Sequence, residues 1–577
     1  MAEAPRLCPL AASSVVDSIP ETALEAIFAY IANAEDRSAV SLVCRKWYNV
    51  DRHIRREVTI TCCYTISPAR LTQRFPYLQF LKIKGKPRAA MFKLVPEDWG
   101  GHAAPWISEI SVNCQCLHSI HLRRMVVTDE DLFVLAKERG HMLQSIKLDK
   151  CSGFSTTGLE AIAKSCRSLR ELFLEESDMQ EHNGNWLCQL SLQNTSLEML
   201  NIAGIDLQNI CPHDVATLAS NCKSLASLKL NELELEDLPE ILSRTTALRE
   251  LGGVSVGANV DQQSKIRLPV TLTSLVALYY MGVDEGDSIV NSIIQPIAAG
   301  LRKIDLQYSC LTVDGHCQLL GHCANLEALE VFNAIGDEGL EVIANKCKNL
   351  HWLRVERGDR DVQQGFVTQR GLISLALNCH RLEYIAAYVS DINNAALSTF
   401  ATNCPKLKDF RLVLLDEGNE VSDFPLDVGV RALMRGCPDI HRFALYLRPG
   451  FLTDRGMEDI GMYGKNLSWA LFGLLGESDV GLKLFANGCP NLKRLEIRDC
   501  VFTEAGIATS VLKMKSLKYI WVQGYKATGT GLDLLPLTND YWSVELVDEP
   551  GAPAQFVAYR CLSQKRADTP SSVTLLG

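Results

Sequence analysis

Several features that mark membrane proteins and enzymes are missing from this chain. It has no run of 18 apolar residues, so no membrane-spanning helix is expected. The Walker phosphate loop, the HExxH zinc motif and the GxSxG nucleophile turn do not occur, and no arrangement of residues predicts a catalytic site or a metal site. The N-terminus makes a poor secretory signal, which predicts an intracellular protein. A non-catalytic binding protein is therefore favoured over an enzyme.

Positive charge is scarce as well. The chain has 58 Lys and Arg against 68 Asp and Glu, for a net charge of -10. Nucleic acid is not expected as a direct partner, because a phosphate backbone selects basic surfaces. At 577 residues the chain is too long for one ordinary core, so it must form several domains or one repetitive array.

Paired cysteine motifs do not accompany the repeats, although the chain holds 21 cysteines. Nine cysteines each lie three residues before the leucine or isoleucine that opens a repeat. They are Cys114, Cys166, Cys222, Cys323, Cys347, Cys379, Cys404, Cys437 and Cys489. A residue that recurs at one repeat position behaves as a small buried hydrophobe. These thiols are therefore predicted to be reduced and structural.

The pattern LxxLxL recurs along most of the chain. Its 17 openers are Leu78, Leu117, Leu143, Leu169, Leu197, Leu225, Leu248, Leu275, Leu301, Leu326, Leu350, Leu382, Leu407, Ile440, Leu467, Leu492 and Leu517. Most steps are 23 to 28 residues, which is the period of leucine-rich repeats. Residues 55–548 are therefore predicted to form an α/β leucine-rich-repeat solenoid with a parallel sheet on its inner face. The tail at 549–577 is expected to be irregular.

Three steps between openers are unusually long. They measure 39 residues after Leu78, 32 after Leu350 and 33 after Leu407. Extra residues cannot enter a packed repeat, so they are predicted to form loops at the rim, where binding sites usually lie.

Residues 14–54 differ from the repeats. Pro20 suits a helix start, and Leu24, Ile27 and Phe28 fall on one helical face. The IPE opening and the SLVCRKW ending resemble the F-box, a small all-helical module that docks on the Skp adaptor of cullin ligases. A solenoid cap with accidental apolar spacing is the alternative.

In LxxLxL the leucines point into the core, so the residues between them form the inner wall. Cations gather there and beside it: Lys82, Lys84, His121, Arg123, Arg124, Lys147, Arg354, Arg357, Arg411, Arg448, Arg494, Arg498 and Lys518. A polyanion such as an inositol polyphosphate would neutralise such a floor. Alternatively, the floor is a solvated basic face paired with Glu175, Glu330 and Glu496.

The same wall presents Tyr388, Tyr446 and Trp521 near the long loops. Aromatic rings beside arginines form a pocket that can bury an apolar body and hold a carboxylate. Arg354 and Arg498 lie five strands apart, about 24 Å on a flat sheet. The solenoid is therefore predicted to curve strongly into a nearly closed horseshoe, which would bring the loop with Arg88 to the same pocket.

Five segments carry a family resemblance: LKIKGKPRAAMF (81–92), HLRRM (121–125), LDKCSGF (148–154), DFRLVLLD (409–416) and IWVQGY (520–525). They resemble the coronatine-insensitive jasmonate receptors of land plants. The resemblance implies a substrate receptor of a cullin-RING (SCF-type) ubiquitin ligase, found in the nucleus and cytoplasm. An amino-acid-conjugated jasmonate would hold the degron of jasmonate ZIM-domain repressors on this receptor.

The resemblance also implies roles for particular residues. The ligand would contact Arg88, Ala89, Phe92, Leu94, Arg354, Ala386, Tyr388, Arg411, Tyr446, Leu471, Arg498 and Trp521. An inositol polyphosphate cofactor would contact Lys82, Lys84, His121, Arg123, Arg124, Arg411 and Arg494. The Skp adaptor would contact Ile19, Pro20, Leu24, Ile27, Phe28, Leu42 and Trp47.

The match has departures and alternatives. Trp352 stands where the family often has an arginine, Arg494 replaces a lysine, and Lys518 replaces an arginine. An auxin receptor is one alternative, although the RAAMF loop argues against it by placing Arg88 and small alanines beside the pocket. A hormone-independent receptor for phosphorylated degrons is the other.

Overall fold

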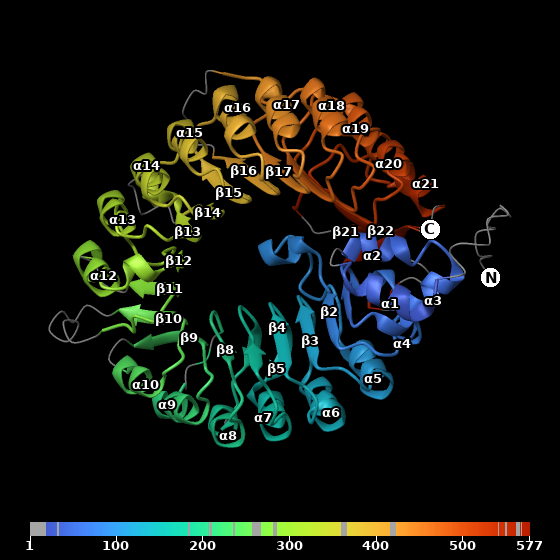
Figure 1. The fold of residues 1–577 in the computed structure, drawn as a ribbon. Helices are drawn as coiled ribbons and strands as arrows, with labels where there is room; N and C mark the ends of the chain where they lie inside the picture. The colour runs from blue at the N-terminus through green and yellow to red at the C-terminus, as the bar shows by residue number, and fades with distance from the viewer. Residues whose placement is uncertain are drawn as a thin grey trace.

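The computed structural model describes residues 19–31, 34–182, 185–205, 207, 210–234, 237–256, 267–280, 286–358, 366–415, 423–539, 542–547, 551–560, 566 and 568–576. Residues 14–18 of the predicted F-box lie outside these ranges. The chain forms a ring in which strands line the inside and helices cover the outside (Figure 1). The predicted strongly curved solenoid is confirmed. No helix in the described ranges is long and apolar enough to cross a membrane.

One sheet follows the inner wall. Its parallel strands, in spatial order, are β1 (Glu57–Ile60), β2 (Phe80–Lys84), β3 (Ser119–Arg123), β4 (Ser145–Asp149), β6 (Glu171–Phe173), β8 (Met199–Asn201), β9 (Ser227–Glu234), β10 (Glu250–Val256), β11 (Ser274–Tyr280), β12 (Lys303–Asp305), β13 (Ala328–Phe332), β14 (Trp352–Glu356), β15 (Tyr384–Val389), β16 (Asp409–Leu414), β17 (Arg442–Tyr446), β18 (Trp469–Gly473), β19 (Arg494–Arg498) and β20 (Tyr519–Gln523). A separate small sheet pairs β5 (Ser152–Ser155) with β7 (Asp178–Gln180).

Each repeat returns through a helix on the outer face. These helices are α4 (Pro68–Arg74), α5 (Ala104–Asn113), α6 (Asp129–Arg139), α7 (Thr156–Ser165), α8 (Trp186–Gln193), α9 (Pro212–Asn221), α10 (Leu238–Arg244), α12 (Gly286–Ile294), α13 (Val313–Leu320), α14 (Gly336–Lys346), α15 (Gln369–Asn378), α16 (Asn394–Asn403), α17 (Asp427–Gly436), α18 (Asp454–Tyr463), α19 (Asp479–Ala486), α20 (Glu504–Lys513) and α21 (Leu535–Thr538). Short 3-10 turns are η1 (Cys63–Thr65), η2 (Arg88–Phe92), η3 (Ala298–Gly300), η4 (Asn333–Ile335) and η5 (Leu532–Leu534).

Leucines and cysteines fill the space between the two layers. All nine repeat cysteines are buried. Several thiols donate to a carbonyl of the preceding repeat, as Cys347 does to Cys323 at 3.2 Å and Cys437 does to Cys404 at 3.3 Å. Burial raises the pKa of the Cys347 and Cys437 thiols to about 12, so they stay protonated. The structural role predicted for these residues is confirmed.

Consecutive helices on the outer face are joined by a repeated contact. Asp479, in the first turn of α19, accepts hydrogen bonds from the backbone N–H and the hydroxyl of Thr503, the residue before α20, at 2.8 and 2.6 Å. Asp427 contacts Thr453 in the same way. Because the carboxylate sits against the next helix, a glycine recurs there, and a Cβ on Gly506 would lie 2.1 Å from Asp479 Cγ.

We therefore expect Gly506→Ala to destabilise the protein by about 1–3 kcal/mol through overpacking. In an ordinary helix the same change would stabilise by about 1 kcal/mol. Urea unfolding of the full chain measures the difference. Thr509→Ala, at an exposed position on the same helix, should stay within about 0.5 kcal/mol of wild type. A Gly506→Ala variant more stable than wild type would contradict the packing argument.

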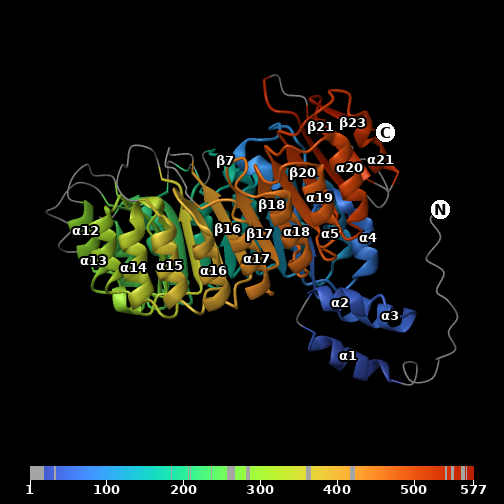
Figure 2. The same cartoon turned by 90° about the horizontal axis from the view of Figure 1, so that it is seen from above.

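The predicted F-box segment contains α1 (Glu21–Ala29), α2 (Ala34–Val40) and α3 (Arg45–Ile54), which project from one side of the ring (Figure 2). Two residues predicted to face the adaptor are instead internal. Leu24 and Phe28 are each 1% exposed because they pack with Val50 to form the core of this helical unit. Ile27 and Leu42 are 54% and 82% exposed and remain available on the surface.

The other predicted adaptor residues surround this small core. Ile19 and Trp47 pack against it from partly buried positions, and Pro20 is exposed just before α1. A buried carboxylate joins the unit to the solenoid, because Asp51 of α3 pairs with Arg74 of α4 at 3.2 Å.

The C-terminal segment differs from the irregular tail that was predicted. It continues the sheet through the antiparallel strands β22 (Gln555–Arg560), β21 (Trp542–Val547) and β23 (Val573–Leu576), with β22 beside β20. Their alternating residues, as in QFVAYR, pack against the loop that follows β2.

A group of buried and partly buried residues, joined by polar contacts, then closes the ring. Arg566 pairs with Glu545 at 2.8 Å and donates to the Tyr64 hydroxyl at 3.1 Å and to the Trp99 carbonyl. Asp568 accepts from the Gly101 N–H at 2.7 Å. We call Tyr64, Trp99, Glu545, Arg566 and Asp568 the clasp. It fastens the last strands to the first repeats.

Candidate functional site

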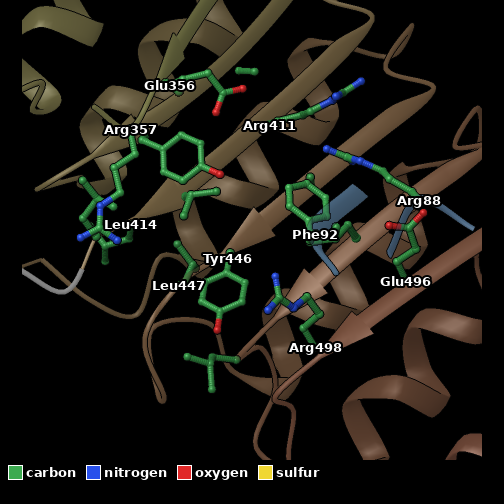
Figure 3. Close-up of a pocket in the computed structure, with 18 of the residues that line it drawn as sticks. Arg88, Phe92, Glu356, Arg357, Arg411, Leu414, Tyr446, Leu447, Glu496 and Arg498 are labelled. Carbon is green, nitrogen blue, oxygen red and sulfur yellow. The ribbon is translucent and has the colours of Figure 1, made fainter. Parts of the chain in front are cut away.

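A cavity of about 600 Å³ opens on the inner wall where the two ends of the ring meet (Figure 3). All twelve residues predicted to contact a ligand line it. They are Arg88, Ala89, Phe92, Leu94, Arg354, Ala386, Tyr388, Arg411, Tyr446, Leu471, Arg498 and Trp521. The curvature of the ring brings together residues that lie more than 400 positions apart in the sequence.

Strand register explains the shape of the cavity. Six consecutive inner-wall positions, from β14 to β19, pair across the sheet in the order Arg354, Ala386, Arg411, Ala444, Leu471 and Glu496. Small alanines alternate with long arginines, so space remains between the two guanidinium groups. Leu471 supplies apolar wall at the far end of this row.

The first long loop forms the other wall. Ala89 is 2% exposed and packs with Trp521 and Val557, so the C-terminal strands hold this loop in place. Trp521 is itself fixed by a hydrogen bond from its indole nitrogen to Gln555 at 3.2 Å. Phe92 is 50% exposed and lies at the rim of the cavity.

Arg88, Arg354 and Arg411 line the floor of the cavity, and they differ in their partners. Arg354 contacts Glu330 at 3.5 Å and also donates to Glu356. Arg411 makes a bidentate pair with Asp409 at 2.8 and 2.7 Å. Of the acidic residues named in the alternative of a paired basic face, Glu330 does pair with Arg354, whereas Arg411 pairs with Asp409, which that alternative did not include.

Arg88 differs, because no carboxylate of the described ranges makes an ion pair with it. Its guanidinium lies 5.4 Å from the ring of Trp469 and 5.6 Å from the ring of Phe92. Burial lowers the pKa of Arg88, and the Coulombic effect of Glu496 only partly offsets this. Arg88 is thus the floor arginine with the least compensation, and an incoming carboxylate would supply it.

Aromatic rings form a layer beneath the floor. Trp352 stacks on Tyr384 with ring centroids 4.5 Å apart, and Arg411 lies over Tyr384 and Trp469 at 5.2 Å from each ring. Trp469 donates to the buried carboxylate of Glu496 at 3.0 Å. Trp352, the departure noted in the sequence, therefore extends this stack.

The far end of the cavity holds Tyr446 and Arg498, with the Arg498 guanidinium 5.6 Å from the Tyr446 ring (Figure 3). The Tyr446 hydroxyl donates to Asp499 at 2.9 Å. Tyr388 lines the same cavity, and burial raises the pKa of its phenol.

Most of the predicted polyphosphate residues form a second cluster beside the cavity. His121 and Arg123 contact Asp149 at 3.4 and 3.1 Å. The remaining four outside the cavity have no ion pair within the described ranges: Lys82, Lys84, Arg124 and Arg494. Arg411, which was predicted for both sites, lines the ligand cavity. Burial and then the charges of cations from both sites, including Arg411 and Arg494, lower the pKa of Arg442 to about 10.

The unpaired cations change the acid–base properties of this cluster. Burial and then the charges of Arg494, Lys82 and Arg124 lower the pKa of Lys84 to about 7. Desolvation and neighbouring cations likewise lower the pKa of Arg124 to about 10. A neighbouring hollow of about 540 Å³ is lined by Lys82 and His121 together with acidic residues such as Glu171.

Sequence reasoning missed several residues that line the cavity or contact the residues that line it. Arg442 occupies an inner-wall position of its repeat, so a signal was present, and it contacts Asp409 at 3.1 Å. Glu356 and Tyr384 also lie at inner-wall positions. Asp499 is the residue directly after β19, and nothing in its residue type indicated a contact with a cavity residue. Within the described ranges no group of three or more His, Cys, Asp or Glu residues could hold a metal ion.

Comparisons with known proteins agree with this architecture. The F-box family model matches residues 16–57, and the model of the transport inhibitor response 1 protein domain matches residues 76–122. Coronatine-insensitive protein homolog 1b of Oryza sativa subsp. japonica is 48% identical over 97% of this chain and 96% of its own length. Coronatine-insensitive protein 1 of Arabidopsis thaliana is 45% identical over 99% of this chain and 98% of its own length.

A more distant relative is the transport inhibitor response 1-like protein Os11g0515500 of Oryza sativa subsp. japonica, at 32% identity over 96% of this chain and 99% of its own length. The identity with the coronatine-insensitive proteins is higher and extends over nearly the whole length of both chains. The N-terminal helical unit, the closed solenoid and the cavity between its ends therefore belong to a member of the family of coronatine-insensitive F-box proteins.

Proposed function

We propose that this chain is a non-catalytic substrate receptor of a cullin-RING ubiquitin ligase and that an amino-acid-conjugated jasmonate fills its cavity. The observation that carries the proposal is the cavity itself, which combines an unpaired buried arginine, Arg88, with apolar walls. Such a site suits a small carboxylate with an apolar body. Membership of the coronatine-insensitive family supports the same ligand class.

The ligand would lie with its carboxylate against Arg88, flanked by Arg354 and Arg411. Its apolar body would contact Ala386 and Leu471, and a ring oxygen would face Tyr446 and Arg498. Tyr388 would hydrogen-bond the conjugate. Those arginines that already have acidic partners would orient the ligand, and Arg88 would supply most of the charge complementarity.

The repressor degron would bind over the open side of the filled cavity. Phe92 and Arg357 lie at this opening and could contact both the ligand and the peptide. The hormone would thus fill a gap between receptor and degron, and neither the hormone nor the degron alone would bind tightly. A role in the nucleus, where transcriptional repressors act, is part of this proposal.

The helical N-terminal unit would connect this site to the ligase. Large hydrophobic side chains that are 50–89% exposed lie on α1, directly after it, or between α2 and α3: Ile27, Tyr30, Leu42 and Val43. Neighbouring exposed apolar residues mark an interaction surface, here for the Skp adaptor. Attachment to the cullin complex would raise the effective concentration of repressor lysines near the conjugating enzyme.

A pull-down tests this function. The chain, co-purified with a Skp adaptor, is mixed with a labelled ZIM-domain degron peptide with and without jasmonoyl-isoleucine. Binding only in the presence of the conjugate is the expected result. Binding with auxin instead would overturn the ligand assignment, and binding that needs degron phosphorylation but no hormone would favour a phosphodegron receptor.

We also propose an inositol polyphosphate cofactor for the second cluster. Lys82, Lys84, Arg124 and Arg494 would hold its phosphates, since none of these cations makes an ion pair in the described ranges. The lowered pKa of Lys84 fits this use, because a bound polyanion would stabilise its protonated form. His121 and Arg123 would add contacts at the edge of the cofactor. Arg411 would affect the cofactor through Arg442, since both arginines contact Asp409.

This proposal predicts proton uptake. Without an anion, Lys84 with a pKa of about 7 is largely neutral at pH 7.5, and bound inositol hexakisphosphate would keep it charged. We expect an uptake on the order of half a proton to one proton per complex. Titration calorimetry in two buffers of different ionisation enthalpy measures it, and affinity should fall as pH rises above 7.

Two variants serve as controls. Lys84→Met should abolish the uptake, whereas Lys483→Met, at an exposed position on α19, should retain it.

The lowered pKa of Lys84 has a second consequence, because the unfolded chain binds more protons than the folded chain between about pH 7 and 10. The anion-free protein should therefore gain stability as pH rises through this window. Proton release on binding would contradict the assignment.

A further inference from the structure

A recurrent backbone feature positions one carboxylate at the far end of the cavity. The sixth residue counted from the start of several strands adopts a left-handed conformation, and at most of these positions its N–H bonds to a carbonyl of the neighbouring repeat. Residues at this position are Arg124, Lys150, Glu176, Gly204, Leu474, Asp499 and Gly524, with φ between 49° and 68°. At Asp499 the φ is 50°, and the side chain reaches Tyr446, two strands away, on β17.

The hydrogen bond between these residues has a fixed direction. Tyr446 Oη donates to Asp499 Oδ2 at 2.9 Å. A phenol has a single proton, so once that proton is given to Asp499 the oxygen offers only lone pairs to a ligand. Burial, reinforced by this bond, raises the pKa of Tyr446 to about 12, so the phenol does not ionise under working conditions.

Arg498 and Tyr388, which line the same cavity, are hydrogen-bond donors, whereas Tyr446 is an acceptor. Arg498 has only donors, and its buried Nε has no hydrogen-bond partner. Tyr388 lines the same cavity, and no hydrogen bond from its hydroxyl is found within the described ranges, so its proton is available. The far end thus combines a cationic donor, Arg498, with a neutral acceptor, Tyr446.

We propose that Asp499 is a specificity-determining positioning residue that holds Tyr446 as a hydrogen-bond acceptor. A ligand carbonyl at this end receives hydrogen bonds from Arg498 alone. A ligand hydroxyl accepts from Arg498 and donates to Tyr446, so it satisfies both residues. This inference rests on the proposed function, because it takes the ring oxygen of the jasmonate conjugate to lie between these two side chains.

The test compares two ligands. One is jasmonoyl-isoleucine, with a ring ketone, and the other is the same conjugate with that ketone reduced to a secondary alcohol. Dissociation constants are measured for the full chain with its adaptor and the degron peptide. Tyr446→Phe should lower the affinity for the alcohol relative to that for the ketone about threefold to tenfold, the range of one neutral hydrogen bond.

Asp499→Gly should instead change the affinity for the ketone. Glycine removes the carboxylate without strain, since Gly204 and Gly524 already occupy the same left-handed position. The freed Tyr446 proton should strengthen ketone binding about threefold to tenfold and leave alcohol binding within about twofold. Tyr388→Phe is the matched control and should not change the ratio of the two affinities.

Infrared spectroscopy measures the hydrogen bonding of the ketone directly. Its result would not change if Asp499 had a purely structural role. With a ¹³C-labelled ring ketone, the carbonyl stretch should shift to lower frequency in Asp499→Gly than in wild type, because a second donor reaches the oxygen. If Tyr446→Phe weakens ketone binding as much as alcohol binding, or if Asp499→Gly leaves either the affinity ratio or the stretch unchanged, Asp499 does not set this polarity. If wild type binds neither ligand, the proposed function falls, and this inference falls with it.

Discussion

Replacing Arg88 by alanine is expected to lower hormone-dependent degron binding about a hundredfold or more, which is the usual effect of removing one partner of a buried charge pair. Arg88 carries this effect because no described carboxylate makes an ion pair with it, so the ligand carboxylate would be its main counter-charge. Titration of the degron peptide at saturating hormone measures the change.

Three further variants make the result specific. Arg88→Lys keeps the charge but loses the planar fork, so binding should be intermediate. Arg302→Ala removes an arginine that pairs with Glu327 outside the cavity, and binding should not change. Arg411→Ala should abolish binding as well, because Asp409 would lose its bidentate partner and place its negative charge near the ligand.

The solenoid should stay folded in Arg88→Ala, since Arg88 has no ion pair within the described ranges and belongs to a loop. Circular dichroism and the unfolding midpoint check this. Degron binding by Arg88→Ala at wild-type affinity would mean that the ligand carboxylate lies elsewhere, and the assignment of the cavity would have to be abandoned.

The second large effect is expected at the clasp. Arg566→Met leaves Glu545 buried without its cation, which typically costs about 3–5 kcal/mol. The same variant should also abolish hormone binding, because the segment around Trp99 would lose the contacts that hold the Arg88 loop against Trp521. Urea unfolding and hydrogen exchange of residues 95–103 measure the two consequences.

A double variant separates charge from packing. Glu545→Leu combined with Arg566→Met removes both charges and should recover much of the lost stability. Burial raises the pKa of Glu545 to about 7 even beside Arg566, and loss of the arginine would raise it further. In Arg566→Met the carboxyl would then be protonated at low pH, so the penalty should shrink as pH falls from 8 to 5.5. A penalty independent of pH would argue against the charge mechanism.

The cavity residues could be predicted because alternation along a strand is strict. Once the leucines of LxxLxL were placed in the core, Arg354, Arg411 and Leu471 had to face the inner wall. The ring closure also followed from Arg354 and Arg498, since their distance along a flat sheet exceeds the size of a small ligand.

Features that depend on pairing were harder to predict. The bidentate contact between Arg411 and Asp409 requires side-chain rotamers that periodicity does not fix. Leu24 and Phe28 share a helical face with Ile27, yet only the packing of α3 decides which of them are covered.

The C-terminal strands and Asp499 were missed for related reasons. Residues 549–577 lack the repeat pattern, and their strands form because β20 leaves a free edge that β22 covers. The left-handed position that Asp499 occupies is occupied in other repeats by arginine, lysine, glutamate, leucine or glycine. Residue type therefore does not predict this position.

The clasp also determines when the ring can close during synthesis of the chain. Residues 88 and 566 are 478 positions apart, and a ribosome adding 5–20 residues per second needs roughly half a minute to a minute and a half to pass from one to the other. Throughout that interval the Arg88 loop has left the ribosome without the residues that fasten it. A transcript with a premature stop codon anywhere between 522 and 566 would therefore encode all twelve predicted ligand contacts and still yield a chain with an open ring. Under the proposed function, hormone perception would thus require a chain translated past residue 566.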